Sequence, residues 1–465
     1  MSNEWMSLPV ITPLVVAALL GSAPQIESYR QSADEQASAT EQTQKAKPPA
    51  PKPTPQKPTP TPTQPPPPAT PQDPPEKSTW LPPSLVFGDT ARIDFRVKLH
   101  ADQRAFSPDL RRLDAFDFRR ARVGVEGDFN DNAVEYEVEY DFREQDYPLR
   151  DAFVDVRVKR AIQIRGGKFK LPFSRDELTG AMNLDFAFRS RAAVQLAPGR
   201  SFGGMVHGRV LDRRLQYQVG VFREDGENAR RDPVRLEDGS ETLLDVSRDG
   251  SWRATTTWAA RSTYELANNL EIAAATTRGD VAEGRNGLRG RMVFGGAFFP
   301  RLDVNGRRQR LGLEADYRTD AGSIRAEWMR VSDQRIGQGF DNEDLDPVNA
   351  NGWYIAGTWL ALGPRPGGRA DRPASRVGAI EVAARFEGLR FGGPIDGGEP
   401  SRSPRAAVIV PNGERALTFG ANWYVNRFTR VVANVIREHL DEAARAPVPG
   451  QQNYWGTVVR LQFVL

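Results

Sequence analysis

Apolar and polar residues alternate in run after run between Trp80 and the end of the chain, with clusters of turn-forming residues between the runs. In residues 93–99 the odd positions are apolar, and in residues 134–142 the even positions are apolar and alternate with acids. A period of two is typical of a β-strand with one apolar and one polar face. A soluble sandwich shows the same alternation, but these runs span about 9 to 12 residues, which suits a tilted membrane strand. We therefore expect an all-β transmembrane barrel over residues 80–465.

The connections between the runs predict the number of strands. Seventeen runs can be counted from Thr90 to Phe463, whereas a bacterial single-chain barrel has an even number. Long and short connections alternate only if the run at 289–299 lies inside one long loop, 278–307. We therefore expect a 16-stranded antiparallel barrel. The connection 363–376 is too long for its place among the short turns, and the pattern offers no reason for its length.

One long connection, 166–200, has neither the alternation of a strand nor the stripe of a helix. It is far longer than an ordinary hairpin loop, and it carries six cations against three acids. Inside a barrel, such a loop would place its cations around a constriction. A solvated surface loop with incidental charges explains the same residues. The cations are Lys168, Lys170, Arg175, Arg189, Arg191 and Arg200, and the acids are Asp176, Glu177 and Asp185.

Composition excludes several classes of protein. The chain has no Cys, its three His are far apart, and no hydrolase or zinc motif is present. We therefore expect no enzyme activity, no catalytic residue, no metal site and no cofactor. The net charge of +3 gives no reason to expect a nucleic-acid partner. Only nine of the 63 basic residues are Lys, and the many planar Arg forks suit an anion path, although a GC-rich genome explains the same bias.

The N-terminal region differs from the rest in composition. An apolar run at 8–20 is followed by Gly21, Ser22 and Ala23, which predicts a signal peptide over 1–23. Residues 24–79 are polar and then dense in Pro, which indicates a disordered periplasmic linker. An inert tail is one interpretation. The alternative function is a structural barrel that anchors the cell wall through a contact between this tail and peptidoglycan.

Several short blocks are similar to those of one known family. They are Phe118-Arg119-Arg120-Ala121, Tyr140-Asp141-Phe142, Gly167-Lys168-Phe169-Lys170, Arg189, 289–292, 312–330 and 420–424. With these blocks in order, most of residues 86–465 resembles the phosphate-selective porins, the O and P porins of Gram-negative outer membranes. The resemblance implies a homotrimeric 16-stranded barrel in outer-membrane lipid, with an inward-folded third loop. It also implies passive, anion-preferring diffusion of phosphate or related small oxyanions.

The resemblance also implies site residues. The arginines that match the family's anion-contacting positions are Arg92, Arg119, Arg120, Arg189, Arg289 and Arg291, and Asp141 matches its constriction aspartate. Arg122, Lys168, Lys170 and Glu177 complete the anion-binding and pore-lining set that we predict. Glu177 stands where phosphate-specific members have a lysine, Gly180 and Ala181 stand where they have serines, and Arg122 stands where they tend to have tyrosine. We therefore expect an anion preference with weak discrimination of phosphate.

Arg119 and Arg120 raise a geometric problem, because adjacent strand residues point to opposite faces. One guanidinium would then enter lipid, at a cost of about 2–4 kcal/mol at mid-depth. The apolar face changes from even to odd positions between Phe118 and Val123, so we expect a β-bulge at 119–121 that turns both side chains into the pore. In the alternative interpretation, a ladder of ion pairs stiffens the wall. Its members would be Glu135, Glu137 and Glu139 with Arg119, Arg157 and Lys159.

Overall fold

The computed structural model describes most of the chain after residue 83. The described residues are 84–88, 90–107, 115–130, 132–144, 147–227, 234–235, 241–242, 256–284, 287–293, 296–302, 304–339, 342–363, 378–392 and 409–465. The predicted signal peptide (1–23), the predicted linker (24–79) and nearly all of the unexplained connection 363–376 lie outside them.

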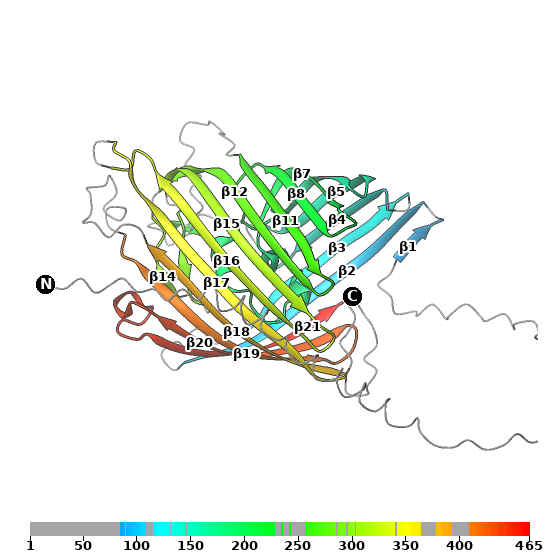
Figure 1. Cartoon of the computed structure of the whole chain (residues 1–465). Coiled ribbons are helices and arrows are strands. Elements are labelled where there is room, and N and C mark those ends of the chain that lie inside the picture. The colour runs from blue at the N-terminus through cyan, green and yellow to red at the C-terminus, as the bar shows by residue number, and fades with distance from the viewer. Residues whose placement is uncertain are drawn as a thin grey trace, which may run out of the picture. The chain divides into compact units, whose positions relative to one another are not determined.

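Sixteen antiparallel strands close into a barrel, which confirms the predicted fold. Each strand pairs with its neighbours in chain order, and the pairing of the first with the last closes the ring. Figure 1 shows the strands running obliquely around the barrel. They are β2 (Ala91–Phe106), β3 (Ala115–Phe129), β4 (Val134–Asp141), β5 (Leu149–Lys159), β6 (Ile162–Lys170), β7 (Arg200–Val210), β8 (Leu215–Phe222), β11 (Thr257–Ala267), β12 (Leu270–Gly284), β15 (Val304–Arg318), β16 (Gly322–Arg335), β17 (Leu345–Leu362), β18 (Ala379–Gly392), β19 (Asn412–Tyr424), β20 (Thr429–Leu440) and β21 (Asn453–Val464).

The smaller elements lie in or beside the connections. β1 (Ser84–Phe87) pairs with β2 beyond the point where β21 ends. β13 (Gly290–Arg291) pairs with β14 (Ala297–Phe299) in a separate sheet, which confirms that the run at 289–299 lies in a loop and does not belong to the barrel wall. The others are β9 (Val234–Arg235), β10 (Glu241–Thr242), α3 (Arg175–Leu178), η2 (Ala181–Asn183), α4 (Arg191–Leu196) and η4 (Ala443–Arg445).

The barrel wall is apolar outside and polar inside. Along β21, Trp455, Val459 and Leu461 are exposed, whereas Arg460 is only 1% exposed. This distribution is the reverse of that in a soluble protein, and it suits a wall with lipid on its outer face. The predicted alternation is therefore that of lipid-facing and interior-facing side chains.

No helix in the described part of the chain has both the length and the apolar character needed to cross a membrane.

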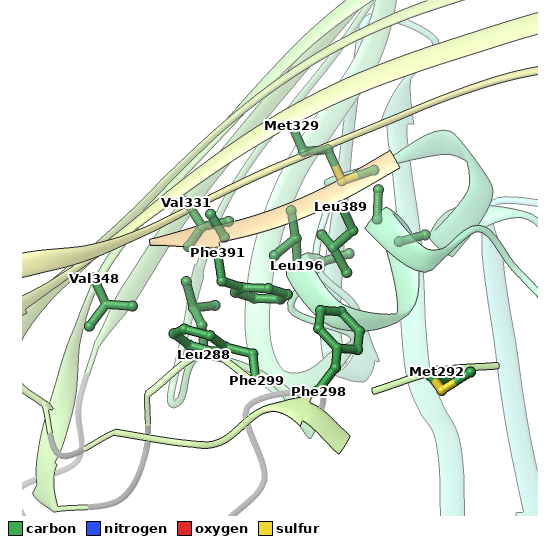
Figure 2. Packing of buried hydrophobic residues seen from close by; sticks show 14 of the residues in the cluster. Leu196, Leu288, Met292, Phe298, Phe299, Met329, Val331, Val348, Leu389 and Phe391 are labelled. Atoms are coloured by element: carbon green, nitrogen blue, oxygen red, sulfur yellow. The ribbon is translucent and has the colours of Figure 1, made fainter. Parts of the chain in front are cut away.

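A hydrophobic core lies inside the barrel, against part of its wall. Leu196 of α4, Leu288 and Phe299 from the connection after β12, and Val348 and Phe391 from the inner faces of β17 and β18 belong to one buried cluster (Figure 2). The rings of Phe299 and Phe391 stack with their centroids 4.8 Å apart. Two loops therefore pack against β17 and β18 and fill this side of the interior.

Gly352 of β17 lets α4 approach the wall closely. A Cβ at this position would lie 2.8 Å from Cβ of Ala192 and 3.0 Å from Cδ1 of Leu196. Any side chain larger than hydrogen at residue 352 would therefore push α4 away from the wall. Glycine here has a packing role, and it fixes how far the helix stands out into the lumen.

Candidate functional site

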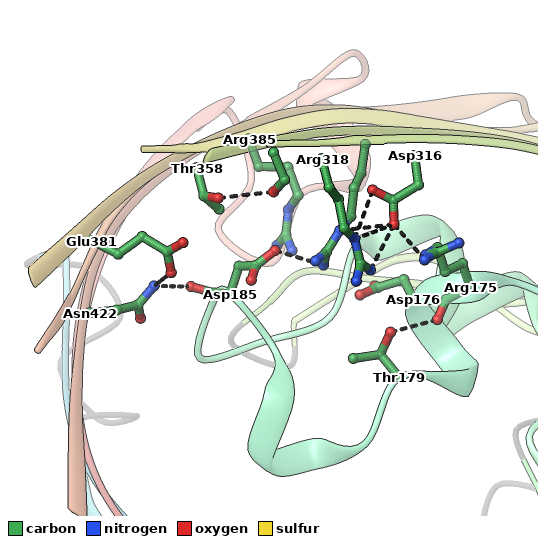
Figure 3. A network of polar contacts seen from close by, with 12 residues as sticks. Arg175, Asp176, Thr179, Asp185, Asp316, Arg318, Thr358, Glu381, Arg385 and Asn422 are labelled. Carbon is green, nitrogen blue, oxygen red and sulfur yellow. Dashed lines mark hydrogen bonds and ion pairs between the residues drawn. The ribbon is translucent and has the colours of Figure 1, made fainter. Parts of the chain in front are cut away.

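The connection 171–199, which we call the third loop, is fastened to strands far from it in sequence (Figure 3). Its Asp185 forms an ion pair with Arg325 of β16 at 2.7 Å, and the backbone oxygen of Asp185 accepts a hydrogen bond from Asn422 of β19 at 2.9 Å. Arg175 pairs with Asp316 of β15 at 2.6 Å. These contacts come from interior-facing side chains of three strands on the side opposite β4 and β5 in the strand order.

Further contacts extend this attachment along the strands. Oγ of Ser174 donates to Glu327, near the middle of β16, at 2.7 Å, and the Tyr354 hydroxyl of β17 donates to the same carboxylate at 2.7 Å. The backbone N–H of Ala187 donates to Asn434 of β20 at 2.7 Å. Because the partners point inward at several heights and around half of the ring, we infer that the third loop folds into the barrel.

The folded loop leaves a cavity of about 990 Å³ along the wall from β2 to β8. Nine of the eleven predicted site residues line it. They are Arg92, Arg119, Arg120, Arg122, Asp141, Lys170, Glu177, Arg189 and Arg289. Gly180 and Ala181, the two departures from the family pattern, also line it. Lys168 and Arg291 do not belong to the lining residues.

The predicted β-bulge is present. Leu99 of β2 pairs with Ala121 of β3, His100 pairs with Arg120, and Ala101 pairs with Phe118, so Arg119 is the extra residue. Both Arg119 and Arg120 line the cavity, while Phe118 stays on the outer face with 52% exposure. Neither guanidinium therefore faces lipid, and the free-energy cost of placing a charged side chain in the membrane is avoided.

Arg120 lies in a group of cations. Its guanidinium donates to Nδ1 of His100 at 3.1 Å, and Nε2 of His100 lies 3.0 Å from Sδ of Met182 in the third loop. Its charged neighbours with the strongest electrostatic effect are Arg119, Arg122, Arg189 and Arg460. Among the described residues, neither Arg119 nor Arg120 forms an ion pair with a carboxylate. The side chains here therefore leave positive charge for a diffusing anion to match.

Other predicted cations are already paired. Arg122 binds Glu139 at 2.9 Å and Asp141 at 2.7 Å, so the matched constriction aspartate is an ion-pair partner in the wall. Arg92 lies 3.4 Å from Asp128. The ladder interpretation describes the wall in part, because Glu135 pairs with Arg157 at 2.8 Å, whereas Glu139 pairs with Lys98 and Arg122. It does not describe Arg119, which takes no part in the ladder among the described residues.

The third loop presents a second group of charges to the cavity. Lys170 donates to the backbone oxygens of Glu177 and Thr179, and Arg189 also donates to the oxygen of Thr179, at 2.6 Å. The Glu177 carboxylate lies 3.4 Å from Arg189 and lines the cavity. The acid that replaces the family's lysine is therefore close to two cations that hold the loop in place.

Two of the predicted site residues, Lys168 and Arg291, lie outside the cavity lining. Lys168 is buried between Glu227, at 2.8 Å, and the backbone oxygen of Leu149, at 2.6 Å. Arg291 lies in β13, where its backbone oxygen accepts a hydrogen bond from Arg191. The pairing of β6 with β5 and β7 is regular through Gly167, so alternation with Ile162 and Ile164 assigns Lys168 to the face of β6 that points away from the cavity.

Several lining residues were missing from the prediction. Arg165 and Arg150 line the cavity. Arg200, one of the predicted loop cations, lines it as well and forms an ion pair with Asp151 at 2.7 Å. Ile162 and Ile164 are on the exposed face of β6, so the same alternation that revealed the strand also places Arg165 inside. Lys98 of β2, which also lines the cavity, could have been found in the same way. No group of three or more metal-binding side chains occurs among the residues that the structure describes.

The fold and the lumenal site together define an outer-membrane porin channel. The chain belongs to the phosphate-selective porin O and P family, whose model matches residues 92–465. As a member of this family, the protein lies in the outer membrane of a Gram-negative bacterium. A search of curated proteins found no significant match.

Solved structures with a similar fold are outer-membrane proteins of low sequence identity. The trimer form of in-vitro folded OmpT from Vibrio cholerae aligns with a TM-score of 0.50 and 12% identity, covering 81% of this chain and 100% of that chain. A loop L8 deletion mutant of the same protein gives a TM-score of 0.51 and 11% identity, covering 81% of this chain and 100% of that chain. The outer membrane channel DcaP of Acinetobacter baumannii gives a TM-score of 0.50 and 10% identity over 80% and 98%. At these identities the similarity extends to the fold alone.

Proposed function

We propose that this porin gives passive, anion-preferring diffusion through the cavity between the third loop and the wall from β2 to β8. The observation that supports this most directly is the pair Arg119 and Arg120, which line the cavity and have no carboxylate partner among the described residues. Two guanidinium forks can replace part of the hydration shell of an anion. Water in the cavity weakens each contact, so that the anion can leave again.

Phosphate and related oxyanions are the proposed inorganic solutes, with weak discrimination among them. Glu177 adds a negative charge to the lining, and Gly180 and Ala181 offer no hydroxyl donors. The cavity also contains many paired charges, such as Arg122 with Asp141, which contribute little net field. A modest preference for anions is the behaviour expected from this balance.

We propose that the channel assembles as a homotrimer in outer-membrane lipid. The family membership supports this assembly, and a solved structure with a similar fold is described as a trimer form. The assembly and the ion preference are separate parts of the proposal, and each has its own test.

The ion preference is tested by reconstituting the full chain in a planar bilayer and measuring the reversal potential across a KCl gradient. The proposal predicts a potential of the sign given by faster passage of chloride than of potassium. A potential of zero or of the opposite sign would contradict it.

A further inference from the structure

The wall of the cavity carries apolar side chains as well as charges. Phe153, Phe169 and Met205, from three adjacent strands, all line it. Phe169 and Met205 belong to a buried cluster that also contains Phe222, and the ring of Phe153 meets that of Phe169 edge-on at 6.1 Å between centroids. Phe169 and Met205 are only 2% and 4% exposed, so the cluster holds in place the half-buried ring of Phe153, which is the aromatic surface that an entering solute can touch.

The third loop adds a second apolar surface. Leu178, Gly180, Ala181 and Val194 line the same cavity. Val194 is 37% exposed, although Ala193 and Leu196 of the same short helix are fully buried. The helix is held by its buried face, so Val194 is directed to the open side.

Each apolar surface adjoins a cation. The Arg165 guanidinium lies 4.1 Å from the centroid of the Phe153 ring, and it also pairs with Asp155. Beside Leu178, Lys170 and Arg189 both donate to the backbone oxygen of Thr179. Positive charge and apolar surface therefore lie within one small solute's reach on both sides of the cavity.

An inorganic oxyanion can interact with only the charged part of this lining. It can interact with the guanidinium groups, but it leaves the apolar surfaces in contact with water. A solute with one carboxylate and a compact apolar body satisfies both, because its charged end meets the cations while its body removes apolar surface from water. We propose that the cavity favours organic anions of this class, aromatic carboxylates in particular, over inorganic phosphate. This inference rests on the proposed anion preference.

The test uses the full-length channel in a planar bilayer with chloride as the current carrier. Benzoate, acetate and phosphate are added in turn, and the concentration of each that halves the chloride current is measured. Benzoate should act at a concentration about fivefold lower than acetate, because its ring covers apolar surface that acetate cannot reach. Phosphate should need a higher concentration than benzoate.

A double variant, Val194→Asn with Leu178→Asn, should bring the acetate-to-benzoate ratio of half-blocking concentrations from about five to close to one. It should leave the chloride-over-potassium preference unchanged. Val194→Ile is the matched control, and it should keep the ratio. If the double variant does not fold, cyclohexanecarboxylate decides on the unmodified channel: its apolar body should make it block at a lower concentration than acetate, and block no stronger than that of acetate would overturn the inference.

The outcomes separate the two proposals. Equal block by benzoate and acetate in an anion-preferring channel would overturn the organic-anion inference alone. A channel without anion preference would overturn the proposed function, and this inference with it. An acetate-to-benzoate ratio of half-blocking concentrations that stays near about five in a folded double variant would also overturn the inference, because the third loop would then not supply the apolar contact.

Discussion

The guanidinium of Arg120 donates a hydrogen bond to Nδ1 of His100 at 3.1 Å. An arginine side chain can only donate, so this nitrogen is an unprotonated acceptor and the imidazole is neutral. His100 thus orients Arg120 without cancelling its charge, as a carboxylate in the same position would. The geometry explains why a buried polar residue on β2 matters to a cation on β3.

Changing the partner of Arg120 should therefore change selectivity. His100→Glu should lower the chloride-over-potassium permeability ratio, because the new carboxylate would pair with Arg120. His100→Gln keeps a neutral acceptor and should leave the ratio nearly unchanged. Both ratios come from reversal potentials. Equal ratios for the two variants would show that the charge of Arg120 does not act on the permeating ion.

Glu177 should limit the affinity for phosphate. Glu177→Lys replaces a carboxylate beside Arg189 with a cation, and each charge is worth on the order of 1 kcal/mol to an anion nearby in a water-filled site. Because the charge changes by two units, phosphate should then block chloride current at a concentration roughly 30-fold lower. Glu177→Gln, the neutral control, should give an intermediate value. If block by phosphate is the same in all three channels, residue 177 does not act on the permeating ion.

Gly352 should set the position of the third loop. Gly352→Val places side-chain atoms where Ala192 and Leu196 now lie, so α4 should move away from β17. Overpacking of this kind costs about 1–3 kcal/mol. We expect altered single-channel conductance and a lower temperature for heat-induced unfolding on gels. Gly357→Val is the control, because a Cβ at Gly357 meets only the backbone oxygen of Ser323 at 3.6 Å. Similar behaviour of the two variants would argue against the packing role.

Asp225 should make the attachment of the loop after β8 sensitive to acid. Burial by itself would raise its pKa, but Arg310 and Arg308 outweigh this effect and hold the pKa below its usual range. The carboxylate is therefore more acidic in the folded state than in the unfolded state. Its contribution to stability is present above about pH 4, the usual Asp range, and is lost as the pH falls through the lower folded-state pKa.

The measurement is the heat-induced gel shift of the folded barrel at neutral and at acid pH. The unmodified protein should lose heat resistance on acidification. Asp225→Asn should be less heat-resistant at neutral pH, and it should lose less on acidification. An identical acid response in both proteins would assign the effect to other carboxylates.

The proposed trimer has a direct test of its own. Native mass measurement in mild detergent should give three times the mass of the chain, and unheated samples should migrate as a larger species on gels. A strictly monomeric mass under the same conditions would contradict the assembly proposal.

The sequence predicts the barrel well because lipid imposes one rule on every strand. Apolar residues must face outward, so alternation marks the strands, and the change of phase between Phe118 and Val123 marks the bulge. The alternation of long and short connections correctly removed residues 289–299 from the wall. These features depend on neighbouring residues and on the membrane, both of which leave a local pattern.

The rest of the site depends on contacts between distant residues. Nothing local shows that Asp185 will meet Arg325, or that Phe299 will stack on Phe391. Arg291 and Arg289 are two positions apart, yet only Arg289 lines the cavity, because the small sheet of β13 and β14 directs the chain. The interior core that fills one side of the barrel therefore could not be predicted, although it determines where the open cavity lies.

The reversal potential of an Arg119→Ala and Arg120→Ala double variant tests the central claim most directly. Arg415→Ala with Arg437→Ala is the matched control, because both side chains are on exposed faces of β19 and β20 and outside the cavity lining. All three channels are first shown to fold by the heat-induced gel shift, and then compared in the same KCl gradient. The account predicts that the chloride-over-potassium ratio falls about threefold or more in the first variant, since it loses two cations that form no ion pair among the described residues, and stays unchanged in the control. An unchanged reversal potential in the Arg119 and Arg120 variant would contradict it.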